Sequence, residues 1–311
     1  MSDADPPSSY DYVPIVDRAP LRFPNGARIA LVLTINCEYW EKSRPGQKEP
    51  LFTGGPMTIP HALPGDVWDT VNWTWREYGQ RIGIWRVLEE FDRAGVPASC
   101  TVNGMTLTER PRIVEALKER GWEIVPHNWA QNDLLTYYAF DPERERAVIR
   151  RTLEEFERAV GRPATAWLSS ALRGTEHTPE FLRESGVIAY CDYLNDDQPY
   201  LIRTRHGPIV CVPYSNDIND FNLFARGGLS TAAGGEMLRA CFDQLYLEGK
   251  QSGRLMNLGL HPHVIGQPHR IAALREFLDY AAGREGVWFA TREEIAGWYL
   301  GVHAEHFPGQ G

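Results

Sequence analysis

Short apolar segments alternate with amphipathic helical segments along most of the chain, and this alternation limits the fold more than any other feature. The first apolar run, residues 28–35 (RIALVLTI), is typical of a parallel strand buried on both faces. Residues 83–94 and 142–160 carry hydrophobic side chains at helical spacing, and a glycine follows each segment. Seven or more such strand–helix units predict an α/β protein built as a parallel, distorted (β/α) barrel.

The remaining elements are placed by the same patterns. Strands are expected at residues 98–102, 122–125, 164–168, 188–191, 209–212, 255–260 and 287–290, and helices at 113–120, 178–185, 235–247, 271–281 and 293–299. An open doubly wound sheet is the alternative, but the sequence has no G-x-G-x-x-G loop to support it. No linker divides the chain, so we expect a loose tail over residues 1–20 and one barrel domain over residues 21–311.

One long segment, residues 37–78, is rich in Gly, Pro and Trp and shows no clear periodicity. Loops of that length in a compact domain are usually functional. Its aromatic residues at 68–78 fit either a wall or lid of a ligand pocket or a subunit interface, and the sequence does not decide between these two uses.

Charge and cysteine content exclude several function classes. The chain has 41 acidic and 32 basic residues, a net charge of −9, and no Lys/Arg cluster. A nucleic-acid or anionic-membrane partner is therefore not expected, because both require a basic face. The five cysteines include no C-x-x-C pair, which argues against a disulfide framework or a zinc finger. With no export signal and no apolar run of about 18 residues, a cytoplasmic protein with a small-molecule partner is expected.

Polar side chains follow the predicted strands directly, where active sites of parallel α/β folds lie. Together they supply a carboxylate, imidazoles and amides, which is an acid/base set. These residues are Asn36, Glu38, Asn103, His127, Trp129, Tyr214, Asn219, Asp220, His261 and His263. Each also has a structural interpretation: a strand-end histidine is often a satisfied core residue, and Asn219-Asp220 fits an Asx turn. Their shared position at the ends of strands favours a site.

At these same residues the chain resembles the polysaccharide deacetylase (NodB-homology) superfamily, and within it the branch of metal-independent allantoinases and cyclic-imide hydrolases. The resemblance spans residues 28–298. It rests on the order and spacing of Asn36-x-Glu38, EYGQRIGIWRVLEEFDRAGVPAS (77–99), GWEIVPHNW (121–129), NDDQPY (195–200), VPYSNDIND (212–220) and GLHPHVIGQPHR (259–270).

This resemblance implies a seven-stranded distorted (β/α) barrel that hydrolyses an amide C–N bond and is often a dimer or tetramer. Metal-dependent members carry Asp-Asp after the first strand and H-x-x-x-H after the third. Here Cys37-Glu38 and Gln131 stand at those places. The arginine of a middle strand is also absent, with Leu168 near that position and Arg173 five residues on as a substitute to be tested.

We therefore expect no cofactor. Zinc or another divalent metal is the alternative, bound by Glu38 and His127 with Asp133 or His263 as the third ligand.

The function expected from these residues is hydrolysis of a small cyclic amide, ureide or imide. Glu38 is expected to act as general base, with a pKa raised by apolar surroundings, and His261 as general acid. His127, Asn36 and Asn103 are expected to orient the carbonyl or stabilise its oxyanion. Asn103, Trp129, Tyr214, Asn219, Asp220 and His263 complete the predicted substrate-binding set, together with Asn36.

Three alternatives remain at the level of sequence. One is a metal-dependent N-deacetylase of a carbohydrate or a small N-acyl compound. Another is a non-catalytic small-molecule or carbohydrate-binding protein that has kept the fold. The third makes Cys37 a nucleophile, although neighbouring residues on a strand face opposite sides, so Cys37 and Glu38 should not both reach the pocket.

Overall fold

The computed structural model describes residues 9–41 and 70–307 and shows a mixed α/β protein whose strands are mainly parallel. In one sheet the order is β3-β2-β1-β8, with β9 also paired to β1; in the other it is β4-β5-β7-β6, with only β6 antiparallel to its neighbour. The strands are β1 (Ile29–Cys37), β2 (Ser99–Val102), β3 (Glu123–Pro126), β4 (Ala166–Trp167), β5 (Ala189–Tyr190), β6 (Tyr200–Ile202), β7 (Ile209–Cys211), β8 (Arg254–Leu260) and β9 (Val287–Phe289).

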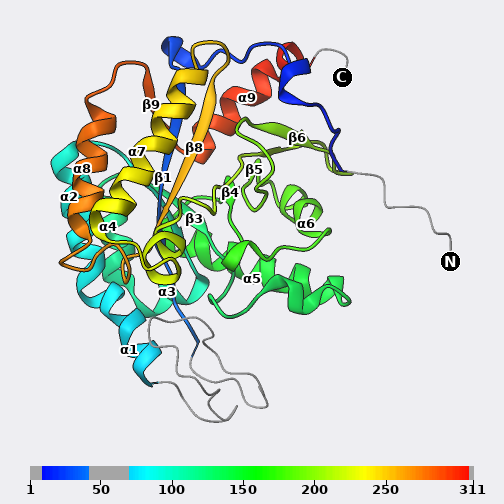
Figure 1. Ribbon diagram of the computed structural model, residues 1–311. Helices are drawn as coiled ribbons and strands as arrows, with labels where there is room; N and C mark the ends of the chain where they lie inside the picture. Colours follow the sequence, from blue (N-terminus) through cyan, green and yellow to red (C-terminus); the bar gives the residue numbers. More distant parts are fainter. Residues whose placement is uncertain (1–8, 42–69, 308–311) are drawn as a thin grey trace.

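Helices surround the strands. In Figure 1, α2, α7 and α8 cover one flank of β1 and β8, while α5 and α6 lie on the other side of the molecule. The helices are α1 (Thr70–Tyr78), α2 (Ile84–Ala94), α3 (Gly104–Glu109), α4 (Pro111–Glu119), α5 (Pro142–Val160), α6 (Thr178–Glu184), α7 (Thr231–Glu248), α8 (Ile271–Ala282) and α9 (Arg292–His306). Short 3-10 or π segments are η1 (Ile15–Asp17), η2 (Pro24–Gly26), η3 (Gly79–Gly83), η4 (Leu135–Tyr138), η5 (Ser170–Leu172) and η6 (Phe221–Arg226).

The two sheets meet around a common interior, which gives the distorted barrel expected from the sequence. The Leu168 amide donates to the Pro126 carbonyl at 3.3 Å, linking the ends of β4 and β3. On the other side, the Asn257 amide of β8 donates to the Pro213 carbonyl after β7 at 3.4 Å. Within the described ranges the strand pairing does not run continuously around the ring, so the barrel is open where these single contacts replace a ladder.

Alternation along β1 separates the helix-facing core from the barrel interior. Ile29, Leu31, Leu33, Ile35 and Cys37 belong to one hydrophobic cluster, which also includes buried side chains of α2, α7 and α8. The residues between them face the interior, because successive side chains of a strand point to opposite faces. Because of this alternation, the Glu38 carboxylate faces the barrel interior and the Cys37 thiol faces the helices.

The interior is polar at its centre. Arg292, at the start of α9, has no exposed surface. Its guanidinium donates to Thr34 at 2.7 Å and also to Ser99, and the Thr34 hydroxyl donates to Asn257 at 2.8 Å. The Nε of Arg292 has no hydrogen-bond partner among the described residues, but its two terminal nitrogens connect α9 to β1 and β2, and Thr34 extends the network to β8.

The α/β elements agree with the predicted ones to within a few residues at most ends, and α5 has the predicted bounds. Three elements were not predicted. Helix α1 lies in the segment expected to lack periodicity, α3 follows β2 directly, and β6 adds an antiparallel strand beside β7. The short α3 and β6 carry too few residues for a periodic pattern, and α1 lies in a segment that lacks one, so tertiary packing decides all three.

Residues 9–20, expected to be part of a loose tail, are held against the barrel. The Arg18 guanidinium forms an ion pair with Asp196 at 2.6 Å, and both side chains are about nine-tenths buried. The Tyr10 ring lies 5.1 Å from that of Tyr200. Residues 9–20 thus contact the barrel through a buried ion pair and an aromatic contact, while the predicted division into tail and barrel domain stays a prediction.

The five cysteines are all described, and none forms a disulfide, as predicted. The part of the chain that the structure describes contains no helix long and apolar enough to cross a membrane.

Candidate active site

Three predicted catalytic side chains meet at the carboxyl ends of the strands. Glu38 follows β1, His127 follows β3 and His261 follows β8. Because β1 pairs in parallel with β2 and β8, and β2 pairs with β3, these strand ends lie at the same edge. All three side chains are buried, and all three line a cavity of about 410 Å³.

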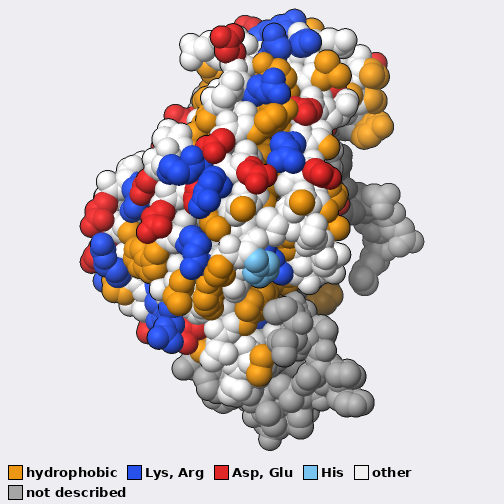
Figure 2. Space-filling model, turned by 60° about the vertical axis from the view of Figure 1, so that its left-hand side comes forward, with side chains coloured by type: hydrophobic (Ala, Val, Ile, Leu, Met, Phe, Trp, Pro, Cys, Tyr) orange, Lys and Arg blue, Asp and Glu red, His pale blue; other side chains and the backbone are white. Residues whose placement is uncertain are grey.

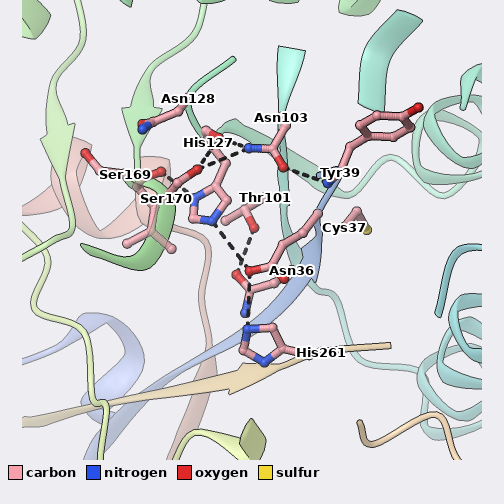
Figure 3. A network of polar contacts seen from close by, with 12 residues as sticks. Asn36, Cys37, Tyr39, Thr101, Asn103, His127, Asn128, Ser169, Ser170 and His261 are labelled. Atoms are coloured by element: carbon pink, nitrogen blue, oxygen red, sulfur yellow. Dashed lines mark hydrogen bonds and ion pairs between the residues drawn. The ribbon is translucent and has the colours of Figure 1, made fainter. Parts of the chain in front are cut away.

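Glu38 lies between the two imidazoles. Its Oε1 is 3.4 Å from Nε2 of His261 and 3.9 Å from Nε2 of His127. The Nδ1 of His127 donates to the Leu168 carbonyl at 2.6 Å, which leaves its Nε2 directed at the site. Figure 3 shows His127 and His261 converging from different strands, while Cys37 points away from them.

Asp220 orients the second imidazole. Its Oδ1 accepts a hydrogen bond from Nδ1 of His261 at 2.6 Å, and its Oδ2 accepts from the backbone amides of His261 and Ile265 at 2.7 and 3.2 Å. The sequence predicted Asp220 as a substrate-binding residue. The structure places Asp220 outside the cavity lining, with its carboxylate oxygens accepting hydrogen bonds from His261 and Ile265.

The pKa values of Glu38 and His261 are shifted by their neighbours, and the shift of Glu38 is opposite to the one expected from the sequence. Burial alone would raise the pKa of Glu38, but the charge of His261 and hydrogen bonds from His127 and His261 lower it below its usual range. Burial opposes protonation of His261, yet the carboxylates of Glu38 and Asp220 raise its pKa to about 10. The expected raised pKa of Glu38 is therefore wrong: at neutral pH the pair is a carboxylate beside an imidazolium.

Four other predicted substrate-binding residues line the cavity: Asn36, Tyr214, Asn219 and His263. The Asn219 amide donates to the Tyr214 hydroxyl at 2.9 Å, so these two side chains form one wall. A Cβ at residue 259 would overlap that hydroxyl at 1.8 Å, which requires glycine there. The Asn36 Oδ1 accepts a hydrogen bond from the Thr101 hydroxyl at 2.8 Å, and its side-chain nitrogen donates a long one, 3.4 Å, to the Leu260 carbonyl.

His263 lies among aromatic rings. Its imidazole is 4.5 Å from Trp75 and 5.5 Å from Trp40, in edge-to-face geometry. Burial and the charge of His261 hold the pKa of His263 well below its usual value, so this imidazole is neutral. Its Nε2 is buried without a hydrogen-bond partner among the described residues, a polar atom that a ligand would satisfy.

Two predicted residues lie elsewhere. Asn103 is fully buried; its Oδ1 accepts from the Tyr39 amide at 2.8 Å, and its side-chain amide donates to the His127 carbonyl and to Ser170. It joins the loops after β1 and β3 (Figure 3), and its role in substrate binding stays a prediction. Trp129 packs under the Arg151 guanidinium, 3.4 Å from its ring centre, and against Gly104 of α3. Neither residue lines the cavity.

The metal alternative requires a third ligand beside Glu38 and His127. Of the two candidates, Asp133 accepts a hydrogen bond from Tyr138 at 2.6 Å, and the His263 ring packs edge-on against Trp75. Among the described residues, no three His, Cys, Asp or Glu side chains are arranged to hold a metal. The described side chains therefore do not supply the three ligands that the metal alternative requires.

Sequence reasoning missed Asp192, which follows β5 by two positions. Its carboxylate accepts from the Ser169 amide at 2.7 Å, the Tyr190 hydroxyl at 2.8 Å and the Gly174 amide at 3.2 Å. It thereby holds the loop that contains Leu168, the acceptor for His127. The available signal was the same as for Glu38: a carboxylate at the end of a strand.

Helix α1 shows how part of the long aromatic segment is used. Trp73 is buried against Tyr39, and Trp75 packs on the ring of His263. In the described residues these aromatic side chains thus build the surroundings of the site. Residues 42–69, including Trp68, lie outside the described residues, so the expectation of a lid or interface there stays a prediction.

Comparisons with known proteins agree with this geometry. The polysaccharide deacetylase family profile matches residues 75–187. The crystal structure of a probable polysaccharide deacetylase from Pseudomonas aeruginosa PAO1 is 30% identical and superposes with a TM-score of 0.82, covering 90% of this chain and 94% of the other. The structure of PuuE allantoinase is 28% identical with a TM-score of 0.86, covering 98% and 100%.

A Schizosaccharomyces pombe protein, whose name assigns it to the same family, is 28% identical over 237 residues, which are 71% of this chain and 73% of its own length. The alternative of a non-catalytic binding protein is not supported by these relatives, which are enzymes by name. The chain therefore belongs to the polysaccharide deacetylase family and is a hydrolase of carbon–nitrogen bonds other than peptide bonds.

Proposed function

We propose that this protein hydrolyses the amide C–N bond of a small cyclic amide, ureide or imide by acid/base catalysis without a metal. The observation that carries the proposal is the chain Asp220–His261–Glu38, which places a carboxylate and an imidazolium side by side in a cavity. The cavity of about 410 Å³ suits a small molecule. Similarity to an allantoinase over nearly the whole chain supports a ring substrate.

The reaction needs one proton acceptor and one proton donor. Glu38, ionised at neutral pH, accepts a proton from a water molecule as its oxygen attacks the carbonyl carbon. When the C–N bond breaks, the departing nitrogen takes the proton on Nε2 of His261. Glu38 then returns its proton to Nε2 of His261 across their 3.4 Å contact, which restores both groups. The product is a carboxylic acid, which releases its proton to solvent as a carboxylate, with a free amine, amide or urea nitrogen.

Other side chains orient the reacting carbonyl. The Asn36 amide and the Nε2 side of His127 face the same cavity, so they are placed to hold the carbonyl and its developing negative charge. Tyr214 and Asn219, joined by a hydrogen bond, form another part of the cavity wall. Each of these roles is part of the proposal.

The test is the Glu38→Gln variant, assayed with allantoin, hydantoin and succinimide. Loss of the base is expected to lower kcat by about 10²–10⁴-fold with a smaller change in KM. Glu109→Gln is the matched control, since Glu109 is an exposed carboxyl at the end of α3. Wild-type turnover by Glu38→Gln would contradict the assignment.

A second measurement addresses the metal alternative. Purified protein is analysed for metal content and assayed on the same rings and on N-acetylglucosamine oligomers before and after chelation. Full ring hydrolysis in a metal-free sample is the expected result. Stoichiometric zinc, with activity lost on chelation, would replace the proposal by metal-dependent N-deacetylation.

A further inference from the structure

The charged residues of the cavity are mostly cations. Its lining contains the arginines Arg76, Arg173 and Arg226, and Glu38 is its only acidic residue among those described. The charge of Glu38 is offset by the imidazolium of His261, 3.4 Å away. The chain as a whole has a net charge of −9, and Figure 2 shows acidic and basic side chains mixed over one outer face. A cavity with excess positive charge is thus a local feature.

Arg173 lies on the loop after β4, with an exposed side chain. No ion pair joins it to an acidic side chain of the described residues. Its position is nevertheless fixed, because Asp192 binds the amides of Ser169 and Gly174 on both sides of it. Just before it, Ala171 and Leu172 have φ angles of 53° and 59°, a left-handed backbone that is uncommon for these residue types. Such strain collects at ligand sites.

Arg226 is the last residue of η6 and also lines the cavity. Its guanidinium is 5.4 Å from the ring centre of Phe221 and donates a 3.4 Å hydrogen bond to Asn222, with no acidic partner among the described side chains. Both neighbours also line the cavity. Arg76 is buried, with its guanidinium 4.7 Å from the ring centre of Trp40. The contact with Phe221 holds the Arg226 guanidinium without neutralising its charge.

We propose that the substrate carries a carboxylate in addition to the amide bond that is cleaved, and that Arg173 and Arg226 bind this carboxylate. The inference rests on the proposed function and narrows it to anionic rings. A guanidinium offers parallel N–H donors that match the two oxygens of a carboxylate. The reacting carbonyl then lies at Glu38, deeper in the same cavity.

The experiment compares hydantoin with 5-carboxymethylhydantoin, which adds one carboxylate to the same ring. The measured quantity is the ratio of kcat/KM for the carboxylated ring to that for the neutral ring. We expect a ratio of about ten or more in the wild type, and a fall of about tenfold in Arg173→Met and in Arg226→Met, since each removes a charge-assisted hydrogen bond. Added salt should lower the wild-type ratio. Arg239→Met, an arginine of α7 outside the cavity, is the control and keeps the wild-type ratio.

A ratio near one, or one that both variants leave at the wild-type value, overturns the inference while ring hydrolysis itself stands. If neither ring is hydrolysed, the proposed function fails, and calorimetric binding of 5-carboxymethylhydantoin decides the inference separately. Binding that weakens about tenfold in Arg173→Met supports the anion site. Equal binding of the two rings, or none, overturns it.

Discussion

The Asp220→Asn variant tests the central electrostatic argument of the site. Asp220 accepts three hydrogen bonds, two of them from His261, and its charge is one of the two that raise the pKa of that imidazole to about 10. An asparagine keeps the size of the side chain but removes the charge and one acceptor. One of the three donors then faces an N–H group, so the imidazole turns or loses its proton.

The expected loss can be sized from these contacts. A general acid contributes about 10²–10⁴-fold to a rate, so an imidazole that has turned away should lower kcat/KM by up to that factor, which is a rise of about 3–5 kcal/mol in activation free energy. A raised pKa means that the folded protein favours the charged imidazole. Catalysis therefore holds while pH lies below about 10 and is lost above it as His261 deprotonates. In Asp220→Asn this upper limit should move down by about one unit or more, at about 1.4 kcal/mol per unit.

The assay is a pH profile of kcat/KM on the ring substrate for wild type, Asp220→Asn and Asp217→Asn. Asp217 is an exposed carboxylate three positions away and serves as the control. Thermal unfolding of each variant separates misfolding from a change in the acid. The electrostatic argument would be refuted by a folded Asp220→Asn protein with wild-type kcat/KM and an unmoved upper limit.

Two further variants test positions where the structure corrected or weakened an expectation. Cys37→Ser should retain activity within about twofold, because the thiol packs among the helices. Its burial and, next, the charge of Glu38 raise the pKa of this thiol to about 12, so it is not a thiolate at neutral pH. Loss of activity with normal stability would restore the nucleophile hypothesis. Asn103→Ala should lower the free energy of unfolding by about 1–3 kcal/mol, because the Tyr39 amide and the His127 carbonyl each lose a hydrogen-bond partner. Urea denaturation measures this change. An unchanged denaturation midpoint with a raised KM would instead support a role in substrate binding.

Much of the fold follows from local patterns. The residues of α5 show a clear helical period and end at Gly161, whose φ of 89° suits glycine, so both ends of this helix were predicted. Helix α1 was not predicted, because its buried residues, Asn72, Trp73 and Arg76, do not form an apolar helical period in the sequence. Contacts of Trp73 with Tyr39 and of Trp75 with His263 hold this helix at the site. The antiparallel β6 depends likewise on a partner strand.

The barrel class and the meeting of Glu38, His127 and His261 could be predicted from the sequence, because parallel strands bring their carboxyl ends to one edge. The period of two along a strand likewise places residue 38 on the interior face. The protonation state and the catalytic role of each group depend on the folded structure. Only folding places Asp220 at 2.6 Å from His261, 41 positions along the chain, and Glu38 at 3.4 Å on its other side. The pKa of a buried group depends on such neighbours and on lost solvent, which no spacing in the sequence records.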